Sequence, residues 1–408
     1  MITNLENILS DSAKRMKRSV IRELLKLTQK PEIISFAGGL PAPSTFPIDE
    51  LKQISSEVLE EDGNAALQYS ATEGDSKLRS ILTQRYQKHG LTISEDNLVV
   101  LTSSQQGLDL AGKIFLNSGD KFICGLPSYL GGLGAFSSYG GIPIGIKFDK
   151  YGMRSDLLEA TLAELLEKDD LPKFIYVIPD FQNPAGITMP EFRRLEIIAI
   201  AKKYNILIIE DSPYRELRFE GIPQKMMYEL DASGQVITLG TFSKIFVPGF
   251  RIGWVIADEA IIDQFVKAKQ STDLCTSSFV QKIAAKYLEK GLFDKNLKGI
   301  IQQYHRKRDV MLEAFEKHMP KGVSWTKPEG GLFLFLNLPE NMDAEDLFKI
   351  AIQKNVAFVL GSAFHCDGSG KNTMRINFSF VDEKECRIGV ERLAESIKTL
   401  MSNKCLSL

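Results

Sequence analysis

The residues of this sequence that are best able to do chemistry stand just past short apolar runs. One segment, Gly240-Thr241-Phe242-Ser243-Lys244, is followed by Arg251, so that two hydroxyls, an amine and a guanidinium fall within eleven residues. Most Ser-Lys pairs lie in surface loops, but this pair follows an apolar run and has few other charges beside it. A second segment, Glu210-Asp211-Ser212-Pro213-Tyr214, follows the apolar run 206–209. A carboxylate at that place either caps a helix or meets a cation, because burying it unpaired is costly.

Two further segments carry groups that can bind an anion or a polar ring. Ser103-Ser104-Gln105-Gln106-Gly107 follows the run 98–101, and Ser104 is expected as the N-cap of a helix. Helix N-termini bind anions through their free N–H groups and the helix dipole, although a plain cap also explains this serine. Asn183-Pro184-Ala185-Gly186 follows the run 174–178, and taken alone it is ordinary turn chemistry.

Considered together, the four segments predict a single site. In an open α/β sheet, ligands bind outside the carboxyl ends of the strands, which is where all four segments are expected to lie. Pyridoxal phosphate (PLP) requires this set of groups. Its phosphate needs N–H donors, hydroxyls and a cation, its pyridine nitrogen needs an acid, and its aldehyde needs a lysine.

The runs that precede these segments have the composition of strands buried on both faces. They are rich in β-branched residues and do not alternate with polar ones, and they comprise 98–101, 174–178, 206–209 and 236–239. Helical periodicity lies between them, over 104–116, 155–168 and 190–204. The pattern predicts a doubly wound α/β domain with a mostly parallel sheet.

The pattern changes near residue 293, where a smaller α+β domain is expected. Its predicted elements are a long charged helix at 294–318, strands near 331–338, 356–360 and 373–378, and helices near 343–354 and 382–401. A basic amphipathic helix is expected from Ala13 to Lys30. The predicted parts are an N-terminal segment, 1–45, that packs with the small domain, a large PLP-binding domain, 46–292, and a small C-terminal domain, 293–408.

The bulk composition excludes several classes of function. A chain of 408 residues is too long for one ordinary core, and its net charge of -2 lacks the basic excess typical of nucleic-acid or anionic-membrane binding. No apolar run reaches the length of a membrane span, and the N-terminus has no apolar signal core. Five scattered cysteines and four histidines lack metal-ligand spacing. We expect a cytoplasmic protein with reduced thiols and without a metal, nucleic-acid or membrane partner.

These motifs resemble those of fold-type I PLP-dependent aminotransferases of class I and II, in particular the 2-aminoadipate and kynurenine aminotransferase subgroup. The most specific string is Ser243-Lys244-x-x-x-Pro-Gly-x-Arg251-x-Gly253, supported by Asn183-Pro-x-Gly186 and Asp211-x-x-Tyr214. The resemblance covers nearly the whole chain, from Ser35 to Arg375.

The resemblance implies the PLP-transferase fold type I, with a seven-stranded, mostly parallel sheet in the large domain. It implies a homodimer with shared active sites. The implied reaction moves an amino group between an L-amino acid (2-aminoadipate, aromatic or aliphatic) and a 2-oxo acid such as 2-oxoglutarate.

The resemblance also implies a role for each site residue. Lys244 is the catalytic lysine that forms the Schiff base, Asp211 pairs with the ring nitrogen, and Asn183 and Tyr214 bond the 3-oxygen of the ring. The other cofactor contacts are Tyr129 stacked on the ring, Ser104, Gln105, Thr241, Ser243 and Arg251 around the phosphate, and Tyr69 from the neighbouring subunit. The implied substrate contacts are Gly39 on a closing segment, Asn183, Arg375 on the α-carboxylate, and Arg22 on an acidic side chain.

Simpler explanations stay open for several of these residues. Tyr129 and Tyr69 also suit a core or an interface. Arg375 in an apparent strand, and Arg22 on the N-terminal helix, also suit solvated charges. The planar guanidinium nevertheless matches a carboxylate well, which favours the binding role of Arg375. The chain departs from the family pattern at Ala71, Asp75 and Gly107, which leaves substrate preference and loop shape open.

Other classes of function fit the sequence less well. A regulator with an aminotransferase-like domain would carry a DNA-binding module ahead of Gly38-Gly39, where little room is expected. The string Gly368-Ser369-Gly370-Lys371 only partly matches a phosphate-binding loop, and a Rossmann fingerprint is absent. A β-lyase or a decarboxylase of the same fold stays open, because such enzymes share the cofactor residues. The sequence names neither the physiological amino donor nor the pathway.

Overall fold

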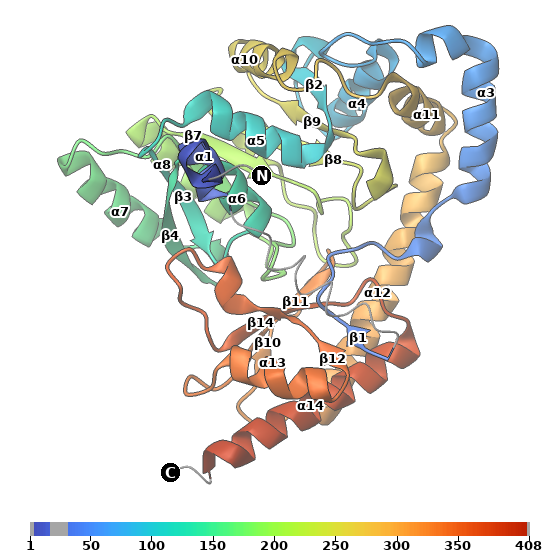
Figure 1. The fold of residues 1–408 in the computed structure, drawn as a ribbon. Coiled ribbons are helices and arrows are strands. Elements are labelled where there is room, and N and C mark those ends of the chain that lie inside the picture. The colour runs from blue at the N-terminus through green and yellow to red at the C-terminus, as the bar shows by residue number, and fades with distance from the viewer. Residues whose placement is uncertain (1–3, 17–31, 406–408) are drawn as a thin grey trace.

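The computed structural model describes residues 4–16 and 32–405. Its centre is an eight-stranded mixed sheet (Figure 1). In spatial order the strands are β2 (Leu98–Leu101), β9 (Gly253–Ile256), β8 (Val236–Thr241), β7 (Leu207–Asp211), β6 (Phe174–Val177), β3 (Lys121–Leu126), β4 (Ile142–Asp149) and β5 (Gly152–Met153). The two-residue β5 only extends β4 as an antiparallel edge, so the other strands are the seven expected from the sequence.

The sheet is mostly parallel, as its apolar strands predict. β4, β3, β6, β7 and β8 pair in parallel, and β9 runs antiparallel between β8 and β2. Successive side chains of a strand point to opposite faces. Ile123 therefore packs in one core with α7 (Ser155–Glu167) and α8 (Glu191–Tyr204), and Phe122 packs in the other with α5 (Ser103–Phe115) and α6 (Leu130–Ser138).

Further helices pack around this layer. α11 (Ser278–Glu289) packs against both α3 (Ile48–Ala66) and α4 (Ser76–Lys88). α10 (Glu259–Gln270) packs on α5, and the short α9 (Met227–Leu230) packs beside α8. Single 3₁₀ turns complete the described elements, namely η1 (Leu5–Asn7), η2 (Pro43–Thr45), η3 (Glu95–Asn97), η4 (Pro248–Phe250) and η5 (Gly361–Phe364).

A second, smaller sheet is built from the last third of the chain. It is antiparallel, in the order β10 (Ser324–Trp325), β11 (Phe333–Asn337), β14 (Thr373–Asn377) and β13 (Val359–Leu360). α13 (Ala344–Gln353) and α14 (Glu383–Cys405) pack together beside it, and the long α12 (Leu292–His318) runs from the large sheet to this region (Figure 1). These elements confirm the helices and strands predicted after residue 293.

The chain before α3 reaches across to this smaller region. β1 (Ile34–Ser35) pairs in parallel with β12 (Val356–Ala357), so segments more than three hundred residues apart in sequence are neighbours. The Phe36 N–H donates to the carbonyl of Ala357 at 2.8 Å and extends this pairing. Residues 37–40 are thereby positioned between the two sheets.

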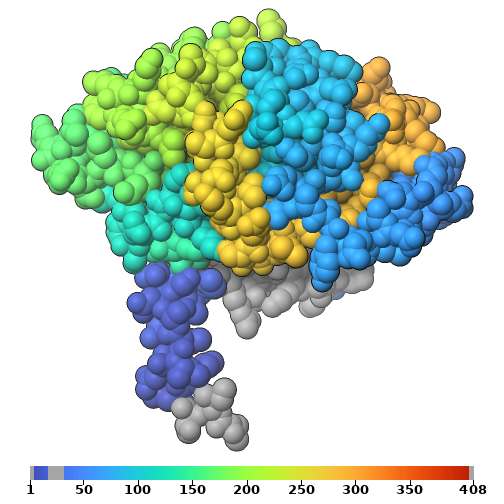
Figure 2. All heavy atoms as spheres, turned by 90° about the horizontal axis from the view of Figure 1, so that it is seen from above, coloured from blue at the N-terminus to red at the C-terminus, as the bar shows by residue number. Residues whose placement is uncertain are grey.

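The predicted N-terminal helix differs from the structure where it is described. α1 (Asp11–Arg15) is short, and Met16 has an extended backbone with ψ of 125°. Ser12 Oγ donates to the carbonyl of Ser138 at 2.8 Å and docks this arm on α6. Figure 2 shows the arm, in dark blue, standing out from the rest of the molecule. The remainder of the predicted helix, including Arg22, lies outside the described residues.

No helix in the described part of the chain combines the length and the apolar character needed to cross a bilayer. Within the same residues, no group of three or more histidine, cysteine or acidic side chains is arranged to hold a metal ion.

Candidate active site

The polar residues predicted for one site stand at the carboxyl ends of neighbouring strands. Asp211 is the last residue of β7, and Lys244 follows β8 by three residues. Asn183 comes after β6, and Tyr129 comes after β3. The small sheet contributes Arg375 from β14. The parallel arrangement explains the convergence of the groups from the large sheet, because β3, β6, β7 and β8 end at the same edge.

Asp211 is a buried carboxyl group with one oxygen left without a partner. Its Oδ2 accepts a 2.9 Å hydrogen bond from the phenol of Tyr176 on β6. No group among the described residues bonds its Oδ1. Burial raises the pKa of the Asp211 carboxyl from 3.8 to about 7, although the bond from Tyr176 acts in the opposite direction. Such a carboxyl fits a protonated ring nitrogen, which would supply both a donor and a positive charge.

Lys244 is partly buried and faces cations instead of an acid. Its Nζ donates to the carbonyl of Gly39 at 2.8 Å. Loss of solvation lowers the pKa of the Lys244 ammonium to about 8, and the positive charges of Arg375 and Arg251 add to this effect. A lysine that becomes neutral near this pH can act as a nucleophile and as a base.

Arg375 lies at the junction of the two sheets, fully buried. Its Nη1 donates to Asn183 Oδ1 at 3.0 Å, and its Nη2 donates to the carbonyl of Ala37 at 2.8 Å. Its Nε has no partner among the described residues. The guanidinium lies 4.3 Å from the ring centre of Phe333 and 5.1 Å from that of Phe364. Burial lowers the pKa of Arg375 to about 10, so the group keeps its charge at neutral pH.

Asn183 and Tyr214 continue this network toward the acid. Asn183 Nδ2 donates to Tyr214 Oη at 3.4 Å. The charge of Asp211 and the phenol of Tyr129 both raise the pKa of Tyr214, after burial as the largest cause. The acid, the amide and the two phenols therefore act on one another within one region.

Hydroxyls and an arginine gather at the start of α5. Arg251 Nη2 donates to Ser103 Oγ at 2.5 Å, and Thr241 Oγ1 donates to Ser243 Oγ at 2.9 Å. Ser104 is not the N-cap predicted from the sequence, because α5 begins one residue earlier, after Thr102. Ser103, the first residue of α5, has a φ of 65°, so the chain turns sharply at the point where the helix begins.

Gln105 ties this turn to the aromatic residue predicted to stack on the ring. Its Nε2 donates to the carbonyl of Gly131 at 3.0 Å, and its Oε1 accepts from Tyr129 Oη at 3.3 Å. Tyr129 is the residue just before α6. The predicted phosphate cradle and the predicted ring platform are thus held together.

Gly253 makes the close approach of β9 to this turn possible. A Cβ on Gly253 would lie 2.4 Å from the backbone nitrogen of Ser104 and 2.5 Å from the carbonyl carbon of Ser103. Replacing Gly253 by alanine is therefore expected to lower the free energy of unfolding by about 1–3 kcal/mol, since backbone must shift. Urea unfolding measures this change. Gly249→Ala is the matched control, because a Cβ there meets no atom within 4 Å, and equal losses in both variants would contradict the expectation.

The buried acid makes a pH-dependent contribution in the cofactor-free protein. Between about pH 4 and 7 folded Asp211 keeps its proton, whereas the unfolded chain releases it, so the free energy of unfolding falls as pH rises. At about 1.4 kcal/mol for each pH unit, the loss reaches about 4 kcal/mol by pH 7. The difference between the wild type and Asp211→Asn, measured by urea unfolding from pH 4 to 8, isolates this group. A difference that is constant with pH would disprove the burial argument.

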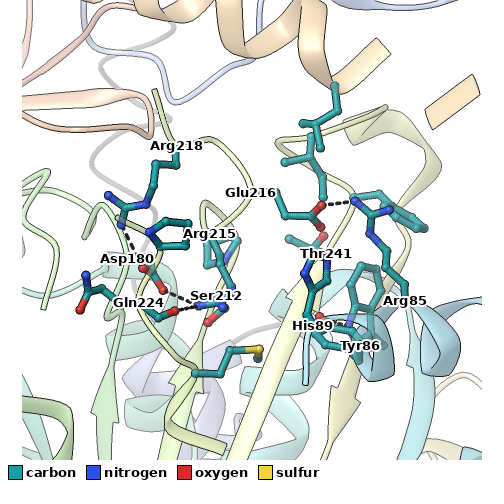
Figure 3. A pocket seen from close by; sticks show the side chains of 17 residues that line it. Arg85, Tyr86, His89, Asp180, Ser212, Arg215, Glu216, Arg218, Gln224 and Thr241 are labelled. Carbon is teal, nitrogen blue, oxygen red and sulfur yellow. Dashed lines mark hydrogen bonds and ion pairs between the residues drawn. The ribbon is translucent and has the colours of Figure 1, made fainter. Parts of the chain in front are cut away.

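A separate cavity of about 350 Å³ adjoins this cluster, because Ser212 and Thr241 line it. Figure 3 shows Arg218 beside Asp180 on one wall and Arg85 beside Glu216 on the other. Neither Lys244 nor Asp211 lines this cavity. The ion pairs on its walls are therefore formed by residues other than Lys244 and Asp211.

Some predicted residues are not brought into the cluster. Tyr69 is 78% exposed, so within the described residues its side chain is not buried against the cluster. Ser104 lies in the first turn of α5. Sequence reasoning also missed Tyr176, which looked like an ordinary residue of a buried strand, and it assigned no role to Ser103. The available signal for Tyr176 was its phenol on the predicted strand that precedes the strand of Asp211.

Comparison with known proteins agrees with this geometry. The family model described as "Aminotransferase class I and II" matches residues 34–393. The chain is 47% identical to the aromatic-amino-acid aminotransferase 1 of Thermococcus litoralis over 97% of this chain and 95% of the relative. The kynurenine aminotransferase of Pyrococcus horikoshii, solved in complex with PMP, has a TM-score of 0.93 at 46% identity, covering 97% of this chain and 98% of that one.

A third relative is bound to a cofactor derivative. The alpha-aminoadipate aminotransferase of Thermus thermophilus, complexed with N-(5'-phosphopyridoxyl)-L-leucine, has a TM-score of 0.89 at 35% identity over 98% of this chain and 99% of that one. The mostly parallel sheet, the buried Asp211 with one oxygen unbonded among the described residues, and Lys244 with its lowered pKa are those of a PLP-dependent enzyme of fold type I. Within that class the chain belongs to the aminotransferases of class I and II, and it is a transaminase that acts on amino acids.

Proposed function

We propose that the cluster at the carboxyl ends of the large sheet holds PLP in the orientation that the sequence predicts. The observation that carries this proposal is the unpartnered Oδ1 of Asp211, whose pKa burial raises to about 7. Asp211 would hold the ring nitrogen, and Asn183 and Tyr214 the 3-oxygen. Tyr129 would cover the ring. Ser104, Gln105, Thr241, Ser243 and Arg251 would surround the phosphate, joined by Ser103, which already bonds Arg251.

In this proposal the protein supplies binding, orientation and proton movement. When bound, PLP supplies an aldehyde carbon that joins an amine and a ring that withdraws electrons. Lys244 Nζ would accept the proton from the substrate Cα and hold it within the site for its return. It must be neutral to do so, which its lowered pKa favours. Arg375 binds the substrate α-carboxylate through its planar fork, with Gly39 and Asn183 beside it.

We infer that the donors are L-amino acids of the 2-aminoadipate, aromatic or aliphatic kind, and that a 2-oxo acid such as 2-oxoglutarate accepts the amino group. The names of the relatives, which include aromatic-amino-acid, 2-aminoadipate and kynurenine aminotransferases, support this range. A role for Arg22 with acidic side chains stays a prediction, because that residue lies outside the described part of the chain.

A panel of amino acids mixed with the PLP-loaded enzyme tests both the reaction and its range. Each good donor is expected to convert the bound cofactor to its amine form and to release one equivalent of 2-oxo acid. 2-Oxoglutarate is then expected to restore the original absorbance. Release of carbon dioxide, or of ammonia with a fragmented side chain, in place of this exchange would favour a decarboxylase or a β-lyase.

The active form is proposed to be a homodimer in the cytoplasm. Exposed apolar side chains support the dimer. Leu67 and Tyr69 are 74% and 78% exposed, and Leu5, Ile8 and Met16 lie exposed on the projecting N-terminal arm (Figure 2). Tyr69 would reach the phosphate of the neighbouring subunit. Sedimentation velocity is expected to give twice the chain mass of 45.6 kDa.

The three parts predicted from the sequence remain the proposed domain division, with boundaries at 1–45, 46–292 and 293–408. The β1–β12 pairing supports grouping residues 34–35 with the small domain, whereas α1 earlier in the same segment packs on α6 of the large domain. The separate small sheet, whose strands all lie after residue 323, supports the last boundary.

A further inference from the structure

Two cysteines that are far apart in the sequence meet beside the proposed cofactor platform. Cys124 Sγ, on β3, lies 3.7 Å from Cys366 Sγ, which follows η5, and the two residues are 242 positions apart. Cys124 is fully buried, whereas Cys366 is partly exposed. The pair therefore joins the large sheet to the loop of the small region, and a small oxidant can reach it through Cys366.

The surroundings of the pair connect both parts of the site. Past Cys124 the chain continues to Ser128, whose N–H donates to the carbonyl of Phe364 at 2.8 Å. Phe364 lies two residues before Cys366, and its ring centre is 5.1 Å from the guanidinium of Arg375. Tyr129 follows Ser128 directly. A movement of the loop that carries Cys366 therefore displaces the ring of Phe364, which packs against the guanidinium of Arg375.

We propose that Cys124 and Cys366 form an oxidisable thiol pair, which a hydroperoxide joins into a disulfide that lowers the turnover of the enzyme. The chemistry needs no group beyond the two thiols and the peroxide. Both thiols are oxidised, and one hydrogen peroxide is reduced to two waters.

The order of the two steps follows from the environment of each thiol. The Cys124 thiol donates to Cys366 Sγ and lowers the pKa of Cys366, so Cys366 ionises more readily. Its thiolate attacks the peroxide: an S–O bond forms, the O–O bond breaks, and hydroxide leaves and takes a proton to give water. Cys124 sulfur then attacks the oxidised sulfur: the S–S bond forms, the S–O bond breaks, and hydroxide leaves with the Cys124 proton as the second water.

Bond formation requires the loop to move. A disulfide has an S–S length of about 2.05 Å, so the sulfurs must approach by about 1.6 Å. Cys124 is fixed in a central strand, so most of this movement falls on Cys366 and on Phe364, two residues before it. Misplacing a group of the site by about 1 Å can lower the reaction rate by up to about 10²-fold. We therefore expect kcat/KM to fall about tenfold.

The test treats the PLP-loaded enzyme with hydrogen peroxide and compares the wild type with Cys124→Ser, Cys366→Ser and Cys386→Ser. Cys386 is the matched control, because it is buried in α14 and loss of solvation raises its thiol pKa to about 12. Wild type and Cys386→Ser are expected to show a peptide that links residues 124 and 366 by mass spectrometry, with the fall in kcat/KM reversed by dithiothreitol. Cys366→Ser is expected to keep its activity.

Two results would overturn the proposal. One is oxidation of single thiols, for example to a sulfinic acid at Cys366, in the absence of the linked peptide. The other is the linked peptide with kcat/KM unchanged. Residue 366 is partly exposed, so Cys366→Ser is expected to fold. The comparison of this variant with the wild type tests the proposal even if Cys124→Ser does not fold.

Discussion

Lys244→Ala is expected to reduce turnover by about 10⁴-fold or more and to remove the absorbance of the lysine-bound cofactor. The amine both joins the cofactor covalently and moves the proton of the substrate Cα, so no other group in the cluster can take over both tasks. Arg375, a nearby cation, keeps its charge at neutral pH and cannot replace the lysine as a base. Steady-state kinetics with the best donor of the panel, together with spectra of the loaded protein, measure both losses.

The controls for this prediction separate chemistry from folding. Lys203→Ala removes an exposed lysine paired with Glu159 and is expected to leave kcat unchanged. Added methylamine is expected to restore a small part of the activity of Lys244→Ala, because it supplies the missing amine. Transamination by Lys244→Ala at a substantial rate without an added amine would refute the role of this residue.

Replacing Arg375 by glutamine is expected to lower kcat/KM by about 10²–10³-fold, mainly through a higher KM for both the amino acid and the 2-oxo acid. Losing one partner of a buried, hydrogen-bonded charge pair costs about 2–5 kcal/mol. Arg375→Lys keeps the positive charge but loses the fork, so a smaller loss is expected. Initial rates with varied concentrations of both substrates give the two KM values.

A structural effect of the Arg375 change must be distinguished from a loss of binding. Arg375 also bonds Asn183 and the carbonyl of Ala37, so thermal unfolding and cofactor absorbance are measured for each variant. Arg387→Gln, on the exposed face of α14, is the matched control. A variant at position 375 that keeps its KM for both substrates would contradict the carboxylate role.

Local patterns in the sequence identified most of the large sheet. The runs at 98–101, 174–178, 206–209 and 236–239 became β2, β6, β7 and β8, because strands buried on both faces leave an unbroken apolar signal. The candidate site residues were the polar residues just past the carboxyl ends of these strands, where ligands bind in an open α/β sheet. The sequence alone therefore predicts Lys244 and Asp211 as site residues.

The features that local patterns missed depend on contacts between distant segments. Tyr176 bonds Asp211 from the adjacent strand, and Arg375 bonds Asn183 from the other sheet, yet no periodicity records either contact. Cys124 and Cys366 looked scattered because they are far apart in sequence. The start of α5 was misplaced by one residue, since the left-handed turn at Ser103 carries no glycine to reveal it.

The parallel pairing of β1 with β12 determines when the enzyme can become active during its synthesis. Residues 34–35 leave the ribosome early, but their partners, residues 356–357, follow only after most of the chain has been translated. Until then the carbonyl of Gly39 has no fixed place from which to accept the bond from Lys244. A nascent chain can therefore form much of the large sheet while its lysine stays unpositioned, and the reaction centre is completed only in the final stage of translation.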